Sequence, residues 1–311
     1  MKDNFGRDID YMRVSLTPKC NLRCWYCTGR SDPDYPPAAE QLNYEERLRI
    51  VRLALERLGI VKIRLTGGEP LLYERLEELI KDLRKLDELQ ELALTTNGIL
   101  LAENAAMLRR SGLDRVNVSL EGANENIYKK ITGQNCLPQV LRGLNALLQV
   151  GFKPKLNVVL CRRFGRAELL ELLKIGQQYA QELRFIELMG HNEYNYPSVD
   201  DMEKQFTDIA PLTPDVGRGT ATRRYTIAGY DVMLGMIPSR TDMFCSSCRR
   251  IRLSVEGQLR ACLFSRTGTP LLPHIRQSCD DDELTEIVRQ TIWQKPSCAQ
   301  GNQVNMCRVG G

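Results

Sequence analysis

Hydrophobic and polar positions in the first two-thirds of the chain alternate between two periods. Short runs rich in branched apolar residues have the period of a strand, and the longer stretches between them have the period of a helix. Asn43, followed three residues later by Glu46, predicts a capped helix start. Strands are predicted at Tyr11–Leu16, Val61–Thr66, Glu91–Thr95, Arg115–Leu120, Lys155–Leu160 and Leu183–Leu188. Helices are predicted near residues 43–58, 74–87, 102–111, 124–131, 138–150 and 166–180.

Strands that alternate with helices predict parallel βα units and an α/β fold. Six units are two short of a complete eight-stranded barrel, so an open barrel and a doubly wound sheet are the alternatives. The pattern changes after residue 190. Further strands and a last helix are predicted at Thr222–Ile227, Asp231–Ile237, Ile251–Val255, Gln258–Leu263 and Asp282–Trp293. We expect residues 1–190 to form the barrel, and residues 191–311 to form a C-terminal domain that covers its opening.

Polar side chains share one face of most predicted strands, because residues i and i+2 of a strand point the same way. Arg184 is ambiguous, since it shares its face with Ile186 and Leu188. The polar face carries Arg13, Lys62, Arg64, Thr95, Asn117, Lys155 and Asn157. The apolar face must pack on the helices, so the polar face is predicted to line a lumen that binds a polyanion such as a triphosphate. A sheet with one solvated face is the alternative.

Composition places the chain among ordinary globular proteins. It has 311 residues, of which 42% are apolar and 26% charged, and its net charge of +4 is too small to indicate nucleic-acid binding. No uninterrupted apolar run approaches the ~18–20 residues that span a bilayer. The first residues lack the apolar segment of a secretory signal. We therefore expect a cytoplasmic protein with no membrane or nucleic-acid partner.

Cysteine is unusually frequent, with eleven residues against two histidines. In a chain expected to be cytosolic this favours metal or redox chemistry with thiolate ligands. Cys20, Cys24 and Cys27 follow the first strand with the spacing C-x3-C-x2-C. A [4Fe–4S] cluster normally takes four thiolates, so three in one loop leave one iron open to a small molecule. A structural zinc loop that lacks one ligand is the alternative.

The first triad resembles the signature of radical S-adenosylmethionine (SAM) enzymes, including the aromatic Tyr26 before the last cysteine. The resemblance implies that the open iron binds SAM, whose reductive cleavage releases a 5′-deoxyadenosyl radical. The sequence Gly67-Gly68-Glu69-Pro70 resembles the superfamily motif for the SAM amino group. Two further motifs, at residues 95–98 and 119–121, end strands three and four, where barrel enzymes keep their chemistry.

A second triad consists of Cys245, Cys248 and Cys262, with the spacing C-x2-C-x13-C. It again offers three thiolates and one open position, and no second C-x2-C follows to complete a zinc ribbon. Structural zinc or a closed cluster is the alternative, with a fourth ligand from Cys279, Cys298 or Cys307.

With both triads in this order, the chain resembles the GTP 3′,8-cyclase (MoaA) family of molybdenum-cofactor biosynthesis almost from end to end. The segments that carry the resemblance are residues 11–15, 64–71, 184–189, 250–253 and 262–264 and the terminal Gly310-Gly311. The resemblance implies two [4Fe–4S] clusters and SAM. The adenosyl radical would abstract hydrogen from ribose C3′ of GTP, and the C3′ radical would attack C8 to give 3′,8-cyclo-7,8-dihydro-GTP.

The resemblance also implies roles for individual residues. Metal ligands would be the six cysteines of the two triads. SAM would contact Tyr26, Gly68, Glu69, Ser119 and Met189. GTP would contact Arg13, Lys62, Arg64, Thr95, Lys155, Arg184, Arg250, Ile251 and Arg252. Catalytic roles would fall to Arg64, Arg250, Arg252, Gly310 and Gly311, with the two terminal glycines reaching into the active site.

The implied partners are GTP as substrate, an electron donor of the flavodoxin or ferredoxin type and a downstream cyclic pyranopterin synthase, with a homodimer possible. The chain departs from the family pattern at Pro18, at Arg249 and across residues 162–166. Two rival functions stay open. One is another radical SAM enzyme with an auxiliary cluster, acting on a peptide or a nucleotide. The other is a non-catalytic iron–sulfur or zinc protein.

Overall fold

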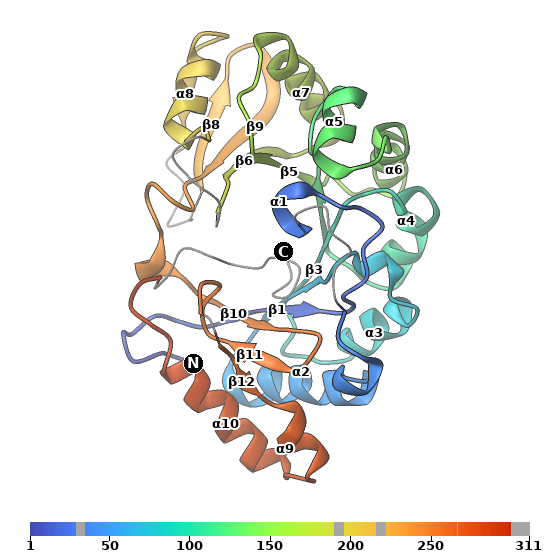
Figure 1. The fold of residues 1–311 in the computed structure, drawn as a ribbon, viewed down its shortest axis with the longest axis vertical. Helices are drawn as coiled ribbons and strands as arrows, with labels where there is room; N and C mark the ends of the chain where they lie inside the picture. The colour runs from blue at the N-terminus through green and yellow to red at the C-terminus, as the bar shows by residue number, and fades with distance from the viewer. Residues whose placement is uncertain (29–34, 190–195, 216–221, 266, 300–311) are drawn as a thin grey trace.

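The computed structural model describes residues 1–28, 35–189, 196–215, 222–265 and 267–299. Its first part consists of six βα units, which confirms the predicted alternation (Figure 1). The strands are β1 (Tyr11–Ser15), β2 (Lys62–Thr66), β3 (Glu91–Thr96), β4 (Arg115–Ser119), β5 (Lys155–Leu160) and β6 (Glu182–Glu187). Strands β1, β2 and β3 are followed by α2 (Tyr44–Leu58), α3 (Leu76–Leu83) and α4 (Leu101–Arg110). Strand β4 is followed by both α5 (Glu125–Thr132) and α6 (Leu137–Gln149), β5 by α7 (Arg166–Tyr179), and β6 by α8 (Val199–Thr207).

Local sequence explains where the first of these helices begins and ends. The Asn43 side chain accepts a hydrogen bond from the Glu46 backbone N–H at 2.8 Å, and the Glu46 carboxylate accepts from the Asn43 N–H at 2.8 Å. This is the reciprocal capping box that the sequence predicts. Gly59 ends the helix with a φ of 69°, a left-handed conformation that glycine adopts without strain.

The sheet runs in the order β12-β11-β10-β1-β2-β3-β4-β5-β6-β9-β8-β7. Strands β1 to β6 are parallel and sequential, which is the order of an open barrel and not that of a doubly wound sheet. Residues after 190 extend both edges of this sheet. On one edge β10 (Arg250–Leu253) pairs parallel to β1, and on the other β9 (Tyr230–Ile237) pairs parallel to β6. The C-terminal part is therefore continuous with the barrel wall.

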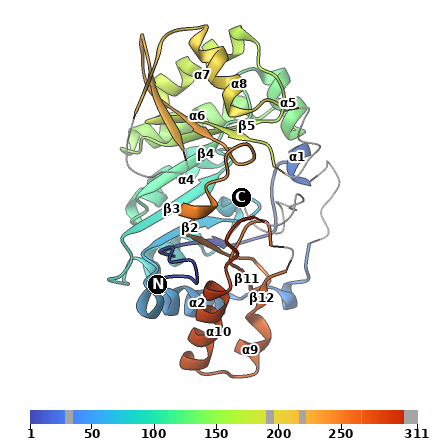
Figure 2. The ribbon, with the colours of Figure 1, turned by 90° about the vertical axis from the view of Figure 1, so that its left-hand side faces the viewer.

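The remaining C-terminal elements complete the two edges (Figure 2). The outer strands are β7 (Leu212–Pro214), β8 (Arg223–Ile227), β11 (Gln258–Arg260) and β12 (Thr269–Pro270). The other helices are α1 (Trp25–Thr28), α9 (Leu272–Arg276) and α10 (Asp281–Trp293), with short 3-10 turns η1 (Ala38–Glu40), η2 (Pro70–Leu72) and η4 (Cys245–Ser247). Helix α10 is tied to α2 by ion pairs from Arg49 and Arg52 to Asp281, at 2.7 and 2.9 Å. None of the described helices is both long and apolar enough to cross a lipid bilayer.

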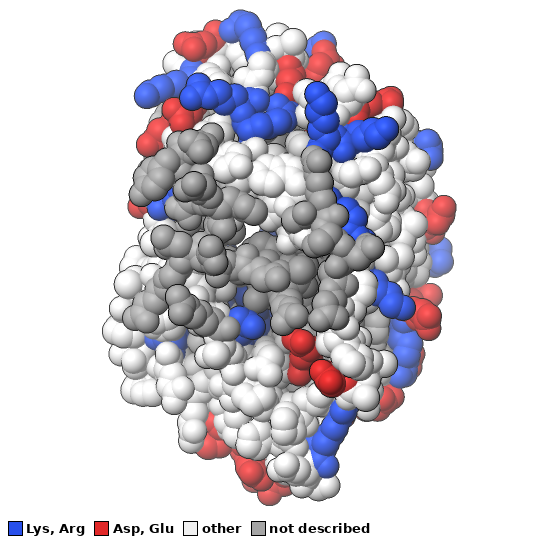
Figure 3. Space-filling model, in the orientation of Figure 1, with Lys and Arg blue, Asp and Glu red and all other residues white. Residues whose placement is uncertain are grey.

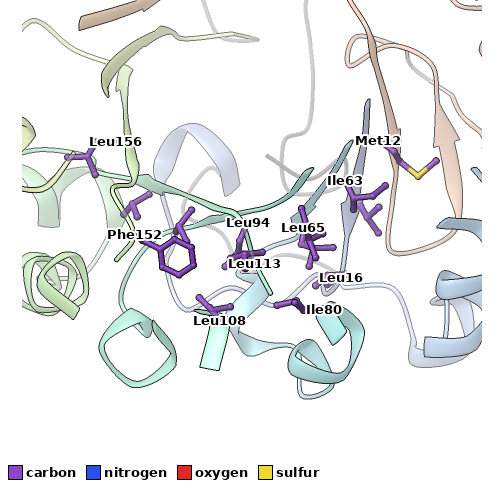
Figure 4. Close-up of a cluster of buried hydrophobic side chains, with 14 of the residues drawn as sticks. Met12, Leu16, Ile63, Leu65, Ile80, Leu94, Leu108, Leu113, Phe152 and Leu156 are labelled. Atoms are coloured by element: carbon purple, nitrogen blue, oxygen red, sulfur yellow. The ribbon is translucent and has the colours of Figure 1, made fainter. Parts of the chain in front are cut away.

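The hydrophobic core lies between the sheet and the helices on its outer face (Figure 4). Strand residues of this core alternate with the polar ones, and each of the following is at most 1% exposed: Met12, Ile63, Leu65 and Leu94 from strands, and Ile80 and Leu108 from helices. Because the apolar side chains fill the outer layer, their polar neighbours along each strand face inward.

Candidate active site

Arginines converge on the inner face of the sheet. In the β-sheet register Arg13 lies opposite Arg64 on one side and Arg252 on the other. Arg64 is 8% exposed and Arg252 is 5% exposed, so this face is not solvated. Burial, with repulsion from Arg13, Arg115 and Arg184, lowers the pKa of Arg64 to about 10. These charges therefore meet across the curved sheet, as the predicted lumen requires.

Tyr11 lies among these arginines. Its ring centroid is 5.8 Å from the guanidinium carbon of Arg13 and 5.4 Å from that of Arg64. Burial alone would raise the pKa of the phenol, but the charges of Arg64, Arg13 and Arg250 lower it to about 8. Aromatic stacking and partial phenolate character offset only part of the repulsion. An anion bound among these arginines would therefore complete the arrangement electrostatically.

The Glu182 carboxylate faces the same side. Glu182 accepts hydrogen bonds from Lys155 at 2.7 Å and Arg184 at 2.8 Å, and Arg224 lies 3.3 Å away. Burial by itself raises the pKa of Glu182, but Arg184 and Lys155 lower it to about 2. Arg184, ambiguous in the sequence, is thereby placed on the inner face. We refer to Arg13, Arg64, Lys155, Arg184, Arg250 and Arg252 as the cation cluster.

In the space-filling view most visible Lys and Arg atoms lie around the rim of this face, and a few are visible near its centre (Figure 3).

Two residues expected to contact the substrate, Lys62 and Ile251, take no part in the charged contacts between described residues. Among the described residues none forms a hydrogen bond or an ion pair with the Lys62 side chain, at the start of β2. Ile251 is fully buried in the outer core, so only its backbone faces the same region as Arg250 and Arg252.

The loop that carries the first cysteine triad is held by the glycine motif. The Gly68 N–H donates to the Thr17 carbonyl at 2.7 Å, and the Glu69 N–H donates to the Lys19 carbonyl at 2.8 Å. A Cβ on Gly68 would lie 2.3 Å from the Lys19 carbonyl oxygen. Only glycine therefore allows β2 to lie against the residues that lead into Cys20.

Glu69 links this loop to the end of β3. Its buried carboxylate accepts from the Thr96 hydroxyl at 2.7 Å and from the Asn97 N–H at 2.8 Å, and burial raises its pKa to about 7. The Asn97 amide donates in turn to Asn21 at 2.7 Å and lies 3.8 Å from the Cys20 sulfur. The Glu69 side chain thus orients the motif instead of reaching into the lumen.

The other residues predicted at SAM lie at the carboxyl edge of the same strands. The Tyr26 hydroxyl donates to Glu121, which follows β4, at 2.5 Å, and burial raises the pKa of Glu121 to about 7. Ser119 ends β4, and Met189 follows β6 by two residues. The predicted SAM residues therefore share one edge of the sheet with the first triad.

The three sulfurs of the first triad lie near one another. Burial, together with the charges of Glu121, Cys27 and Cys20, raises the pKa of Cys24, so the three sulfurs lie within electrostatic reach of one another. Among the described residues no three His, Cys, Asp or Glu side chains converge on one ion position. Each thiolate of a cubane binds a different iron, so such convergence is not required of cluster ligands.

A buried lysine lies beside two cysteines of the second triad. Lys295 is 2% exposed, and its ammonium donates to the Arg250 carbonyl at 2.8 Å and to the Ala261 carbonyl. These carbonyls lie next to the segments that carry Cys248 and Cys262. Burial lowers the pKa of the Lys295 ammonium, whereas Cys248 and Cys262 raise it. Both sulfurs therefore lie close to the charge of Lys295. A buried cation beside two cysteines favours their thiolate forms, as an auxiliary cluster would require.

Three cysteines outside the triads are the candidates for a fourth ligand of the second triad. Cys279 belongs to the α2–α10 contact, where its carbonyl accepts from Arg49 at 2.8 Å. Cys298 is exposed, but one Arg7 nitrogen donates both to the Cys245 carbonyl at 2.8 Å and to the Ser297 carbonyl at 3.2 Å. Its backbone therefore lies near the second triad. Cys307 lies outside the described residues, as do Gly310 and Gly311.

A surface pocket of about 560 Å³ adjoins the first cysteine loop. It is lined by Arg23, Lys129, Lys130, Asn126 and Gly133. The Arg23 guanidinium donates to the Cys20 carbonyl at 2.8 Å, and its backbone N–H donates to the Thr132 carbonyl at 2.9 Å. The basic last turn of α5 and the cysteine loop thus form one outward-facing surface.

Four residues of these sites were not identified from the sequence. Tyr11 and Arg115 stand on the inward positions of β1 and β4, so strand periodicity could have identified them. Glu182 lies just before the predicted start of its strand. Nothing in the local pattern distinguishes Lys295, because its neighbours come from distant segments.

Comparisons with known proteins agree with this geometry. Residues 14–175 match the radical SAM superfamily, and residues 181–300 match the Molybdenum Cofactor Synthesis C family. The chain is 37% identical over 302 residues to a GTP 3′,8-cyclase of Clostridium perfringens (strain SM101 / Type A), with 95% of this chain and 93% of the relative covered. It is 38% identical over 308 residues to the GTP 3′,8-cyclase of Mycolicibacterium smegmatis, with 95% and 85% covered.

Solved structures show the same fold at low identity. The crystal structure of Streptococcus suis SuiB bound to precursor peptide SuiA has a TM-score of 0.65 and 15% identity, and covers 92% of this chain and 66% of that one. SuiB bound to S-adenosylmethionine has a TM-score of 0.51 at 17% identity, with 65% and 44% covered. The family matches together with the two cysteine triads show that the chain belongs to the GTP 3′,8-cyclase family of radical SAM enzymes, which use SAM and a [4Fe–4S] cluster.

Proposed function

We propose that the protein cyclises GTP to (8S)-3′,8-cyclo-7,8-dihydroguanosine 5′-triphosphate, in the first step of molybdenum cofactor biosynthesis. The observation that carries this proposal is the cation cluster on the face of the sheet whose carboxyl edge holds the SAM motifs. A triphosphate carries about four negative charges at neutral pH, and arginine forks match phosphate oxygens. The named relatives support the same substrate.

The first triad would hold the cluster that supplies an electron to SAM and so gives access to the 5′-deoxyadenosyl radical. Tyr26, Gly68, Ser119 and Met189 would bind SAM, and Glu69 would keep the glycine motif in place. Arg13, Lys155 and Arg184 would bind the triphosphate, with Thr95 beside it. These residues would hold the nucleotide next to SAM, and such proximity provides a large share of the rate of a reaction of this kind.

A second [4Fe–4S] cluster at Cys245, Cys248 and Cys262 is part of the proposal. Lys295 supports it, because a buried ammonium lowers the cost of the negative charge that thiolates and cluster carry together. The second cluster would hold the guanine base, and the neighbouring β10 side chains Arg250 and Arg252 would contact the nucleotide. Arg13 lies between Arg64 and Arg252 in the sheet register, so Arg64 is on the same face as these two β10 side chains.

The C-terminal glycines are proposed to enter the same region and to help position the substrate. Glycine has no side chain, so such a terminus fits where a larger residue would clash.

An acidic one-electron donor of the flavodoxin or ferredoxin type is the proposed protein partner. The basic pocket around Arg23, Lys129 and Lys130 supports this, since it borders the loop of the first triad and complements an acidic surface. A cyclic pyranopterin synthase would consume the product.

The test is anaerobic incubation of the reconstituted protein with GTP, SAM and dithionite, followed by mass analysis of the nucleotide. We expect a nucleotide isomeric with GTP, together with 5′-deoxyadenosine. SAM cleavage with unchanged GTP would favour a radical SAM enzyme with another substrate. Absence of SAM cleavage in protein that carries its iron would favour a non-catalytic iron–sulfur protein.

A further inference from the structure

Asn117 is a buried side chain with unused hydrogen-bonding capacity. It stands in the middle of β4 and is 0% exposed. Neither its amide nitrogen nor its amide oxygen has a hydrogen-bond partner among the described residues. An unsatisfied buried polar group destabilises the folded protein, and such groups are few in native proteins. An amide with both ends unsatisfied therefore indicates a bound molecule.

The position of Asn117 relates it to both sets of predicted ligand residues. In the β-sheet register it lies opposite Thr95 on β3 and Lys155 on β5. Ser119, two residues further along the same face, is predicted to bind SAM. Two residues correspond to roughly 6–7 Å along a strand. Asn117 thus stands between the SAM edge and the cation cluster, where hydrogen transfer between the two molecules would take place.

The chemistry of the amide selects one part of the nucleotide. A phosphate only accepts hydrogen bonds, so it would leave the Asn117 oxygen unsatisfied. The guanine base is proposed to lie near β10, and β1, β2 and β3 separate β10 from β4. A ribose hydroxyl both donates and accepts, so one or both sugar hydroxyls can satisfy both ends of the amide.

We propose that Asn117 is a positioning residue that binds the ribose hydroxyls of the nucleoside triphosphate and turns C3′ toward SAM. This inference rests on the proposed function, since it takes the ligand of the cation cluster to be GTP. Asn117 does not touch the atoms that react. Its loss would let the sugar rotate while the triphosphate stays bound.

The test uses Asn117→Leu, which keeps the number and branching of the side-chain heavy atoms and removes both polar groups. In equilibrium binding, we expect the wild-type holoenzyme to favour GTP by about tenfold over 2′-deoxy-GTP or 3′-deoxy-GTP, because one net hydrogen bond contributes about 1 kcal/mol or slightly more. The variant should bind GTP and the deoxy analogue that the wild type disfavours with equal affinity. It should also form several 5′-deoxyadenosine molecules per nucleotide product. Asn104→Leu, on the outer helix α4, is the control and should behave as wild type.

Two results would overturn the inference. One is full discrimination against both deoxy analogues by Asn117→Leu, and the other is no discrimination by the wild type. Failure of the proposed function would differ from both, because a wild type that binds no GTP in any form would refute the substrate itself. A variant that fails to fold is recognised by its melting temperature, and Asn117→Ser, which restores a donor and an acceptor, should then recover part of the discrimination.

Discussion

Replacing Arg64 by methionine should stabilise the protein without nucleotide and weaken its affinity for GTP. Arg64 is buried among like charges, and burial lowers its pKa well below the ordinary value of arginine, to about 10. Each pKa unit corresponds to about 1.4 kcal/mol, so folding carries a cost of about 3 kcal/mol against the charged form. A base with a lowered pKa pays this cost at neutral pH, and the cost is relieved only as the pH rises through about 10.

Methionine keeps most of the side-chain volume and removes the charge. It also removes the contact between Arg64 and the Tyr11 ring, which offsets ~0.5–2 kcal/mol of the gain. We therefore expect the variant to be about 1–3 kcal/mol more stable than wild type, which corresponds to a melting temperature a few degrees higher. One lost charge-assisted hydrogen bond of about 1.5–3 kcal/mol should weaken GTP binding by roughly 10- to 100-fold.

The assay is anaerobic calorimetry of the iron-loaded protein at one scan rate, with and without GTP, together with equilibrium binding. Wild type should gain more stability from GTP than the variant does, because stabilisation by a ligand follows its affinity. Lys81→Met is the matched control. Lys81 is exposed and paired with Glu77 at 2.8 Å, so neither quantity should change. If Arg64→Met melts below wild type without nucleotide, or if it binds GTP as tightly, the interpretation of the cation cluster is wrong.

Three further predictions concern the clusters and the electron donor. Reconstituted wild type should carry about eight irons per chain. The variants Cys24→Ala and Cys262→Ala should each retain about four irons, but only Cys24→Ala should abolish SAM cleavage. A Cys262→Ala variant that keeps all its iron would contradict the second cluster site. Cys298→Ser should keep about eight irons, and a loss of cluster iron would instead indicate a closed site with four cysteines. Reversing the charge of Lys129 and Lys130 to Glu should weaken binding of reduced flavodoxin several-fold at low salt and leave dithionite-driven SAM cleavage unchanged, whereas equal loss with both reductants would exclude a docking role.

Strand periodicity predicted the barrel because the two faces of each strand meet different surroundings. On β2, Ile63 and Leu65 pack on helices while Arg64 faces inward, and the sequence alternates accordingly. Periodicity failed at β6, where Glu182 and Arg184 share a face with Ile186. The ion pair between Glu182 and Arg184 keeps one end of this face polar. The hydrophobic pattern along a single strand does not reveal such a pair.

The C-terminal part was predicted less well, for a topological reason. The sequence predicts its strands but not that β9 and β10 join opposite edges of the barrel sheet, because pairing between distant segments leaves no periodic signal. The same limit hid Lys295, which reaches the Arg250 and Ala261 carbonyls across 45 and 34 residues. The cysteine triads were recognisable because ligand spacing within a loop is local.

Transfer of hydrogen from ribose C3′ is the step on which the proposed function depends. It is tested by incubating the iron-loaded protein anaerobically with SAM, dithionite and GTP that carries deuterium at C3′. Mass analysis of 5′-deoxyadenosine should then show one added deuterium, with the cyclised nucleotide lacking it. Unlabelled 5′-deoxyadenosine formed alongside cyclised nucleotide, or deuterium that stays in the nucleotide, would contradict hydrogen abstraction at this position.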